Sequence, residues 1–142
     1  DQLGQSLYLR EIHGREDGDA PTVDLALERE LGEAIRGLID AGTVTAVHDV
    51  SDGGLLVAIA EMALAGNIGA ELDGMNAGLA FGEAQSRYVV TLPDADALEG
   101  LDLPLMSIGK TGGSALEVNG KPIALTALRE ASDSFFRDWM ED

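Results

Sequence analysis

The feature that most constrains the fold is a β-prone segment that runs through two adjacent glycines into an apolar segment. Residues 43–48 are rich in β-branched side chains and lie between Gly42 and a cluster of Asp, Ser and Gly, which predicts a central strand entering a tight turn. The apolar run of residues 55–65 contains one charged residue, Glu61, and predicts a helix buried on most sides. A strand, a tight turn and a buried helix in this order predict the centre of an α/β domain.

Helical and extended patterns alternate along the rest of the chain. Apolar residues at three-to-four spacing follow Pro21 and stop at Gly42, which predicts an amphipathic helix with Glu28 on its polar, solvent-facing side. The other elements that we expect are a short helix at 94–99, strands at 6–12, 69–72, 87–92 and 105–108, a loop at 74–78, a turn or one helical turn at 81–86, and a turn at 109–113.

The C-terminal part of the chain predicts a hairpin and a closing helix. Asn119-Gly120 separates two β-prone runs, and both residues tolerate the positive φ of a type I′ turn. Pro122 places the second strand, residues 121–125, at an edge of the sheet. Thr126 is expected to cap the last helix. The side chains expected on the buried side of that helix are Leu128, Phe135, Phe136 and Trp139.

Composition narrows the classes of protein and partner. The chain has 142 residues, the size of one ordinary domain, so we expect residues 1–142 to form a single domain with a mixed α/β (α+β) fold. It contains no cysteine, which excludes a disulfide framework and a zinc–thiolate site and favours an intracellular protein. The net charge of −17 disfavours nucleic acid as a partner. The apolar runs are too short to span a membrane. The start at Asp1 is typical of a piece excised from a larger chain.

The turn between the predicted central strand and its helix is the first candidate ligand site. Backbone amides at a helix start bind anions, and glycines let a ligand approach the backbone. Asp49 and Asp52 oppose an anion unless Mg²⁺ lies between them or they cap the helix, so a ligand-binding turn and a capped, tightly packed turn both remain possible. His48 is a candidate base or ring-binding group, with local hydrogen bonding as the alternative. The candidate residues here are His48, Asp49, Ser51, Asp52, Gly53 and Gly54.

Residues 82–87, with the sequence Gly-Glu-Ala-Gln-Ser-Arg, form the second candidate site, which we call the hexapeptide. Gln85 and Arg87 offer planar donors for carboxylate or phosphate oxygens, Glu83 accepts from an amine or amidine, and Ser86 adds a hydroxyl. The alternative is an ion pair between Glu83 and Arg87 that fixes the turn. Residues 109–113 lack the spacing of a phosphate loop. The sequence shows no spacing typical of a metal site or a nucleophile–base pair, so we predict neither catalytic residues nor metal ligands.

Several segments, taken in order, resemble the C-terminal domain of the phosphoribosylformylglycinamidine synthase family. They are residues 48–55, 60–62 and 81–87, followed by 108–110 and the closing segment 128–139. The resemblance covers essentially the whole chain. The wider superfamily includes aminoimidazole ribonucleotide synthase, selenophosphate synthetase and thiamine-monophosphate kinase, which are ATP users and the nearest alternatives.

The resemblance implies both a fold and an activity for a larger parent protein. The expected fold is a three-layer α/β/α domain with a mixed sheet and partial ferredoxin-like topology. The implied activity is that of a cytoplasmic ATP-dependent ligase of purine biosynthesis, which uses ATP and Mg²⁺ to activate formylglycinamide ribonucleotide and ammonia from a glutaminase subunit to displace the activated oxygen. A small accessory subunit and the preceding synthase domains are the other implied partners. Catalytic and most nucleotide ligands lie in those domains, so the chain alone is expected to be inactive and without a tightly bound cofactor.

The resemblance also places this chain in the second of two tandem synthase units. In the first unit, the counterpart of Glu83 to Gln85 is a Glu-Ser-Gln string that touches substrate, and this chain departs from it at Ala84. Three roles remain open: one wall of a ligand cleft, a structural module that packs against its neighbour, and an independent small-molecule sensor.

Overall fold

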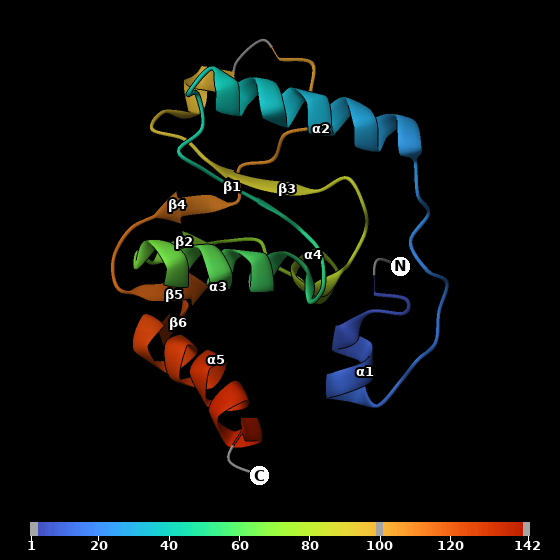
Figure 1. The fold of residues 1–142 in the computed structure, drawn as a ribbon, viewed down its shortest axis with the longest axis vertical. Helices are drawn as coiled ribbons and strands as arrows, with labels where there is room; N and C mark the ends of the chain where they lie inside the picture. The colour runs from blue at the N-terminus through green and yellow to red at the C-terminus, as the bar shows by residue number, and fades with distance from the viewer. Residues whose placement is uncertain (1–2, 99–100, 141–142) are drawn as a thin grey trace. The chain divides into compact units, whose positions relative to one another are not determined.

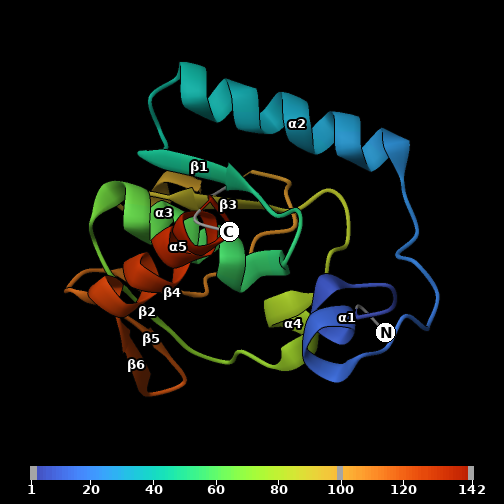
Figure 2. The same ribbon diagram turned by 60° about the horizontal axis from the view of Figure 1, so that its bottom comes forward.

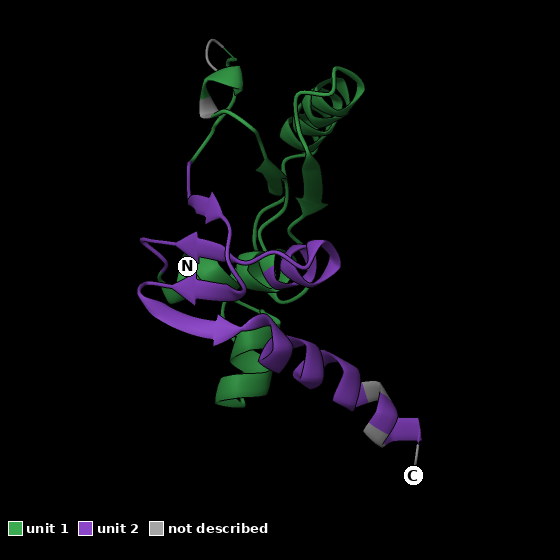
Figure 3. Cartoon of the chain, turned by 90° about the vertical axis from the view of Figure 1, so that its left-hand side faces the viewer, with its two compact units in different colours: residues 1–59, 76–106 green, residues 60–75, 107–142 purple. Residues whose placement is uncertain are grey.

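The computed structural model describes residues 3–98 and 101–140, and it confirms a mixed α/β fold (Figure 1). The chain forms two compact units (Figure 3). Unit 1 comprises Asp1–Ile59 and Asn76–Met106, and unit 2 comprises Ala60–Met75 and Ser107–Asp142. Both candidate sites belong to unit 1, so the packing within this unit decides whether they meet.

Unit 1 is built on a two-stranded antiparallel sheet. Its strands are β1, Ala46–Asp49, and β3, Tyr88–Thr91. Asp49 lies opposite Tyr88. The end of β1 that leads into the glycine turn therefore lies beside the residue that follows the hexapeptide, because antiparallel partners pair across the ladder.

Helices complete unit 1. They are α1 (Leu7–His13), α2 (Leu25–Asp40), the first turns of α3 (Gly54–Gly66), α4 (Ala77–Phe81) and the 3-10 helix η1 (Ala95–Leu98). The carboxylate of Asp24 accepts hydrogen bonds from two backbone N–H groups of the first turn of α2. Because this cap fixes the start, α2 begins at Leu25 and not at Pro21. The rings of Tyr8 and Phe81 stack with centroids 4.4 Å apart, which holds α1 beside α4 (Figure 2).

Unit 2 contains a four-stranded mixed sheet with the order β4-β2-β5-β6. Its strands are β2 (Ala70–Leu72), β4 (Gly109–Thr111), β5 (Ala115–Val118) and β6 (Lys121–Ala124). β2 pairs with β5 in parallel, and the other pairs are antiparallel. α5, Leu125–Met140, follows β6. Pro122 lies in β6, an edge strand as predicted, where its missing N–H costs no ladder bond.

The predicted hairpin turn is confirmed, and its asparagine has a second role. Asn119 and Gly120 have φ values of 50° and 76°, as a type I′ turn requires. The Asn119 side chain accepts a hydrogen bond from Met75 N at 3.1 Å and donates one to Met75 O at 2.7 Å. One carboxamide thus ties the hairpin to the segment that follows β2, with both of its polar atoms satisfied.

The apolar side chains of α3 form much of the core. Leu55, Ala58 and Ile59 are buried in unit 1 and Ala63 in unit 2, and their spacing places them on one face of the helix. The prediction of a helix buried on most sides is wrong, because Val57, Glu61 and Ala65 on the opposite face are exposed. The other buried apolar residues of unit 1 are Leu9, Val50, Ala80 and Val89, and those of unit 2 are Ala70, Leu72, Met75, Leu116 and Leu125.

The prediction of a strand at residues 6–12 is wrong, because local capping favours a helix there. The hydroxyl of Ser6 accepts a hydrogen bond from Leu9 N, and Gly14 ends α1 with φ 62°. A hydroxyl at the start and a left-handed glycine at the end satisfy groups that a short helix otherwise leaves unpaired.

The prediction of a strand at 105–108 followed by a turn at 109–113 is also wrong. The strand is β4, Gly109–Thr111, which pairs with β2. A side chain at Gly109 would collide with the backbone oxygen of Glu71, so this glycine permits close strand pairing, whereas glycines usually indicate turns.

Two smaller predictions need correction at α4 and η1. The expected loop at 74–78 contains the start of α4, which Asn76 caps by accepting a hydrogen bond from Leu79 N, and residues 82–86 follow this helix. The short helix expected at 94–99 is η1, with the Asp94 carboxylate accepting a hydrogen bond from Asp96 N. Residue 99 lies outside the described residues.

The last helix differs from its prediction at both ends. Thr126 lies inside α5 rather than at its cap, and Leu125 is the buried residue of its first turn. Phe135 and Trp139 are 60% and 71% exposed, although both were expected on a buried side. Their rings lie edge to face, with the ring centroids 6.1 Å apart. The side chain of Phe136 lies outside the described side chains. No helix in residues 3–98 and 101–140 is long and apolar enough to cross a bilayer.

Leu116→Ala tests the core of unit 2. Leu116 lies in β5 and is 3% exposed, so its truncation should lower the free energy of unfolding by about 2–5 kcal/mol. Ile12→Ala, at a residue of α1 that is 67% exposed, is the matched control and should change it by less than about 0.5 kcal/mol. Urea unfolding followed by circular dichroism measures both. Equal effects of the two substitutions would contradict this placement of the core.

Candidate functional site

The turn between β1 and α3 requires glycine at two consecutive positions. Gly53 and Gly54 have φ values of 81° and 78°, in the left-handed region that side chains disfavour. A Cβ on Gly53 would lie 2.6 Å from a methyl carbon of Val57, and one on Gly54 would lie 2.7 Å from the backbone of Phe81. The second glycine therefore lets the end of α4 pack directly against the turn. We call residues 51–54 the glycine bend.

Glu83 joins the glycine bend to the hexapeptide. Its Oε1 atom accepts a hydrogen bond from Gly53 N at 2.8 Å and another from Leu7 N at 3.1 Å. A carboxylate that accepts from backbone N–H groups forms charge-assisted bonds, which are stronger than neutral ones. The two candidate sites predicted from the sequence thus meet in unit 1, and α1 is attached to both.

Arg87 closes the end of α4. Its guanidinium donates hydrogen bonds to Gly82 O at 2.9 Å and to Leu79 O at 3.0 Å. Burial lowers the pKa of Arg87 from its ordinary value, but the group stays charged because arginine titrates far above neutrality. Glu83 and Arg87, both within the described residues, bind backbone groups and do not form the ion pair considered as an alternative.

Glu28 is a residue that the sequence interpretation missed. Its carboxylate accepts hydrogen bonds from Ser86 Oγ at 2.7 Å and from Tyr88 OH at 3.3 Å. The helical pattern predicts that Glu28 faces solvent, but its side chain faces these two residues instead. Ser86 has φ 61°, an uncommon conformation for a serine. Burial and the Glu28 carboxylate raise the pKa of the Tyr88 phenol, which keeps it a neutral donor.

A spacing argument could not have identified the role of Glu28. It lies 58 and 60 residues from its two partners, and glutamates on an amphipathic helix usually mark its solvated face. The only local signal is that it lies in the first turn of α2, where an acidic side chain is also favoured by the helix dipole.

His48 and Asp49 form a local pair at the end of β1. The Nδ1 atom of His48 lies 2.6 Å from Asp49 O and 3.5 Å from Asp49 Oδ1, which matches the local alternative for this histidine. Asp49 itself has a carboxylate that is 66% exposed.

The remaining candidate residues lie at the surface, in the glycine bend or in the hexapeptide. Ser51, Asp52 and Gln85 are exposed, and their side chains form no hydrogen bond with the described part of the chain. The backbone bond from Val50 N to Arg87 O, 2.9 Å long, keeps the two segments adjacent. Each of these three side chains is therefore able to contact a ligand without breaking an internal bond.

The glycine bend does not fit a bare phosphate. The Gly53 N–H, one of the donors expected to hold an anion, already donates to Glu83. The exposed acidic groups nearby, Asp49 and Asp52, would repel an anion. Caps from Asp49, Ser51 or Asp52 are likewise not formed within the described chain, where Gly54 N instead donates to the backbone oxygen of Ser51. The bend is thus held by Glu83 and by backbone bonding.

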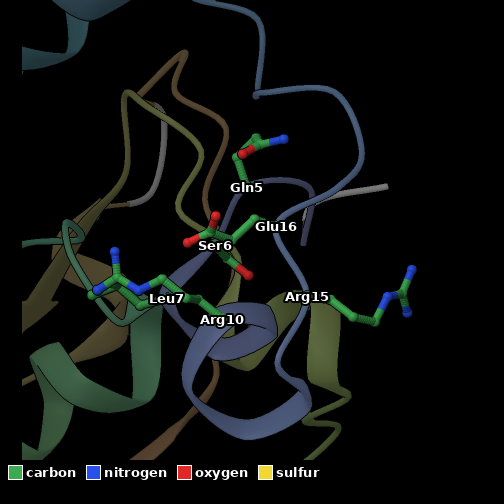
Figure 4. Close-up of a pocket in the computed structure, with 6 residues that line it drawn as sticks. All are labelled: Gln5, Ser6, Leu7, Arg10, Arg15 and Glu16. Atoms are coloured by element: carbon green, nitrogen blue, oxygen red, sulfur yellow. The ribbon is translucent and has the colours of Figure 1, made fainter.

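A pocket elsewhere in unit 1 does not offer an alternative ligand site. It has a volume of about 90 Å³ and is lined by Gln5, Ser6, Leu7, Arg10, Arg15 and Glu16 (Figure 4). Ligand sites usually enclose about 300–1,000 Å³, so this pocket is too small for a nucleotide. Its arginines form ion pairs with Glu11 and Asp17. In residues 3–98 and 101–140, no group of three His, Asp or Glu side chains is placed to hold a metal ion.

Gly54→Ala tests the close packing at the bend. A methyl group would meet the Phe81 backbone, and φ 78° is strained for alanine, so the free energy of unfolding should fall by about 2 kcal/mol or more. Gly37→Ala is the matched control, because Gly37 lies inside α2 with nothing within 4 Å of its position for a methyl group, and it should stabilise by about 0.5–1 kcal/mol. Thermal unfolding compares the two. A neutral Gly54→Ala would show that the bend is looser than described.

Glu83→Ala tests the link between the bend and the hexapeptide. Its removal leaves Gly53 N and Leu7 N without their acceptor, which should cost about 1–3 kcal/mol. Glu33→Ala is the control, since among the described residues Glu33 pairs only with exposed Arg29 on α2, and such pairs contribute less than about 1 kcal/mol. Urea unfolding measures both, and a Glu83 effect no larger than that of Glu33 would exclude a structural role.

Comparison with known proteins identifies the family to which the chain belongs. The family described as AIR synthase related protein, C-terminal domain, matches residues 2–118. The chain is 61% identical over 140 residues to phosphoribosylformylglycinamidine synthase subunit PurL of Novosphingobium aromaticivorans, covering 98% of this chain and 18% of that protein. It is 54% identical over 150 residues to the PurL of Rhodopseudomonas palustris, covering 97% of this chain and 20% of that protein. The chain thus spans about a fifth of the length of these curated relatives.

Solved structures share the fold at low identity. Thermotoga maritima PurL complexed with FGAR superposes with a TM-score of 0.59 at 22% identity, over 76% of this chain and 22% of that one. PurLQS from Thermotoga maritima gives a TM-score of 0.60 at 20% identity, over 88% and 24% of the two chains. The match to the family model over most of the chain, together with this fold, shows that the chain belongs to the family of C-terminal domains of AIR synthase related proteins.

Proposed function

We propose that this chain is the C-terminal domain of a phosphoribosylformylglycinamidine synthase and forms one wall of a ligand cleft that other parts of the parent protein complete. In this proposal, Ser51, Asp52 and Gln85 face the cleft, and Glu83 holds them in place from behind. The observation that carries this role is the bond from Gly53 N to Glu83 Oε1, because it brings the glycine bend and the hexapeptide to one edge of unit 1.

The activity of the parent is proposed from its relatives. High identity to PurL proteins over nearly the whole chain supports an ATP-dependent ligase that converts formylglycinamide ribonucleotide to the amidine in the cytoplasm. Thermotoga maritima PurL has been solved with FGAR and with AMPPCP, which supports the same classes of ligand here. We further propose that residues 1–142 act as one domain of the parent.

ATP and Mg²⁺ would be held mainly by the parent's other domains. The described residues do not offer a phosphate site at the bend, since the Gly53 N–H already donates a hydrogen bond to Glu83. Within the described ranges, no cluster of side chains is placed to hold a metal ion. The PurLQS assembly of Thermotoga maritima supports a glutaminase subunit and a small accessory subunit as partners of the parent. The chain alone should therefore lack ATP hydrolysis and amidine synthesis.

A purely structural role is the second candidate, and a specific observation favours it. The side chains of Glu83, Ser86 and Arg87 already form hydrogen bonds with groups of this chain. Within the hexapeptide, contact with a ligand in the parent would then be left to Gln85, the exposed polar side chain that forms no hydrogen bond with the described residues.

Gln85→Ala in the full-length parent separates the two roles. If Gln85 binds the ribonucleotide, the KM for formylglycinamide ribonucleotide should rise about tenfold, the cost of about one hydrogen bond, with thermal stability unchanged. Glu30→Ala, at an exposed residue of α2, is the control and should leave KM unchanged. Steady-state kinetics at varied substrate and at varied ATP measures both. Unchanged KM values for both ligands would instead support the structural role.

A further inference from the structure

The hairpin turn of unit 2 contains a chemically labile dipeptide. Asn119-Gly120 is the only Asn-Gly pair in the sequence; the other two asparagines, Asn67 and Asn76, precede Ile and Ala. Asn119 is exposed at the residue level, although its carboxamide is partly buried against Met75. A glycine after asparagine leaves the next backbone nitrogen unhindered, because glycine has no side chain.

The relevant reaction is intramolecular and uses water alone. The backbone nitrogen of Gly120 attacks the side-chain Cγ of Asn119, so that a new C–N bond closes a five-membered succinimide ring. The side-chain nitrogen leaves as ammonia and carries away the proton of the Gly120 N–H. Water then opens the ring at either carbonyl, giving aspartate or isoaspartate. No oxidant, metal or enzyme is needed.

The native structure opposes the first step. The Asn119 carboxamide is held through both of its polar atoms by Met75, at 2.7 Å from Nδ2 to Met75 O and 3.1 Å from Met75 N to Oδ1. Moving Cγ toward Gly120 N would break both bonds. The type I′ turn also fixes φ at both residues, 50° and 76°, so the reaction needs a state in which the hairpin has opened.

The products of the reaction cannot re-form the hydrogen bonds that Asn119 makes with Met75. An aspartate would place a carboxylate oxygen against Met75 O where Nδ2 now donates, so two acceptors would face each other and one bond would be lost. Isoaspartate would add a carbon to the backbone of a two-residue turn. The pairing of Val118 with Lys121 depends on that turn length, since turn geometry sets hairpin register.

We propose that Asn119 is a site of spontaneous deamidation, that opening of the β5–β6 hairpin sets its rate, and that its products cannot rebuild the clamp on Met75. Aspartate and isoaspartate at position 119 therefore accumulate each time the open hairpin reacts, and the original asparagine is not restored.

The rate comparison tests the first part. The chain is incubated in mildly alkaline buffer with and without denaturing urea, and peptide mapping with an isoaspartate-specific methyltransferase follows residues 67, 76 and 119. Reaction at Asn119 should be at least about tenfold slower in the folded chain than in urea, and Asn67 and Asn76 should react far more slowly than Asn119 in urea. Equal rates at Asn119 with and without urea would overturn the proposal, as would an Asn119 that is inert in urea.

Two variants test the coupling to the hairpin. Leu116→Ala removes a buried side chain of β5 and should speed the reaction in native buffer several-fold, whereas Ile12→Ala in unit 1 should not; equal rates would contradict the proposal. Urea at concentrations below the unfolding transition provides the same test without a substitution, since the rate must rise with the amide exchange of β5 and β6. Asn119→Asp, the chemical product, must accelerate exchange of those amides, and an unchanged hairpin in this variant would overturn the claim about the clamp.

Discussion

The candidate site depends on one carboxylate oxygen that accepts two backbone hydrogen bonds. Glu83 Oε1 binds the amides of Gly53 and Leu7, and so joins the glycine bend, the hexapeptide and α1. Those amides would otherwise need other partners, since buried backbone donors are rarely left unpaired. The arrangement changes the meaning of the glycine bend: the positive end of α3 is satisfied by a carboxylate from the same chain, so its two glycines serve close packing more directly than anion binding.

The sequence predicted the elements whose signals are local. The order of strand, bend and helix from β1 to α3 and the Asn119-Gly120 turn agree with the predictions, because periodicity and turn chemistry act over a few residues. The central place predicted for the strand is wrong, since β1 belongs to a two-stranded sheet with β3, and α3 is buried on one face instead of most sides. The errors have local or tertiary causes. The strand expected at residues 6–12 is helix α1 because Ser6 and Gly14 cap it, and the turn expected at Gly109 is a strand because β2 pairs closely with it.

The site was predicted in composition but not in bonding. The residues of the bend and the hexapeptide were identified as two separate candidates, and a shared place in the wall of a ligand cleft was one of three roles left open. Which atom bonds to which depends on pairings between residues such as Glu83 and Leu7, which are 76 positions apart, and Glu28 and Ser86, which are 58 apart. Spacing rules carry no information at that distance, so glutamates on an amphipathic helix and in a polar turn look alike until the chain is folded.

Amide hydrogen exchange at Gly53 tests the central claim most directly. If Glu83 accepts from this N–H, Gly53 should be protected in the wild type and lose that protection in Glu83→Ala, while the neighbouring Gly54 amide, which donates to Ser51 O, keeps its own. A Gly53 amide that exchanges at the rate of an unstructured peptide in the wild type would show that the carboxylate does not join the two segments, and the account of the site would fail.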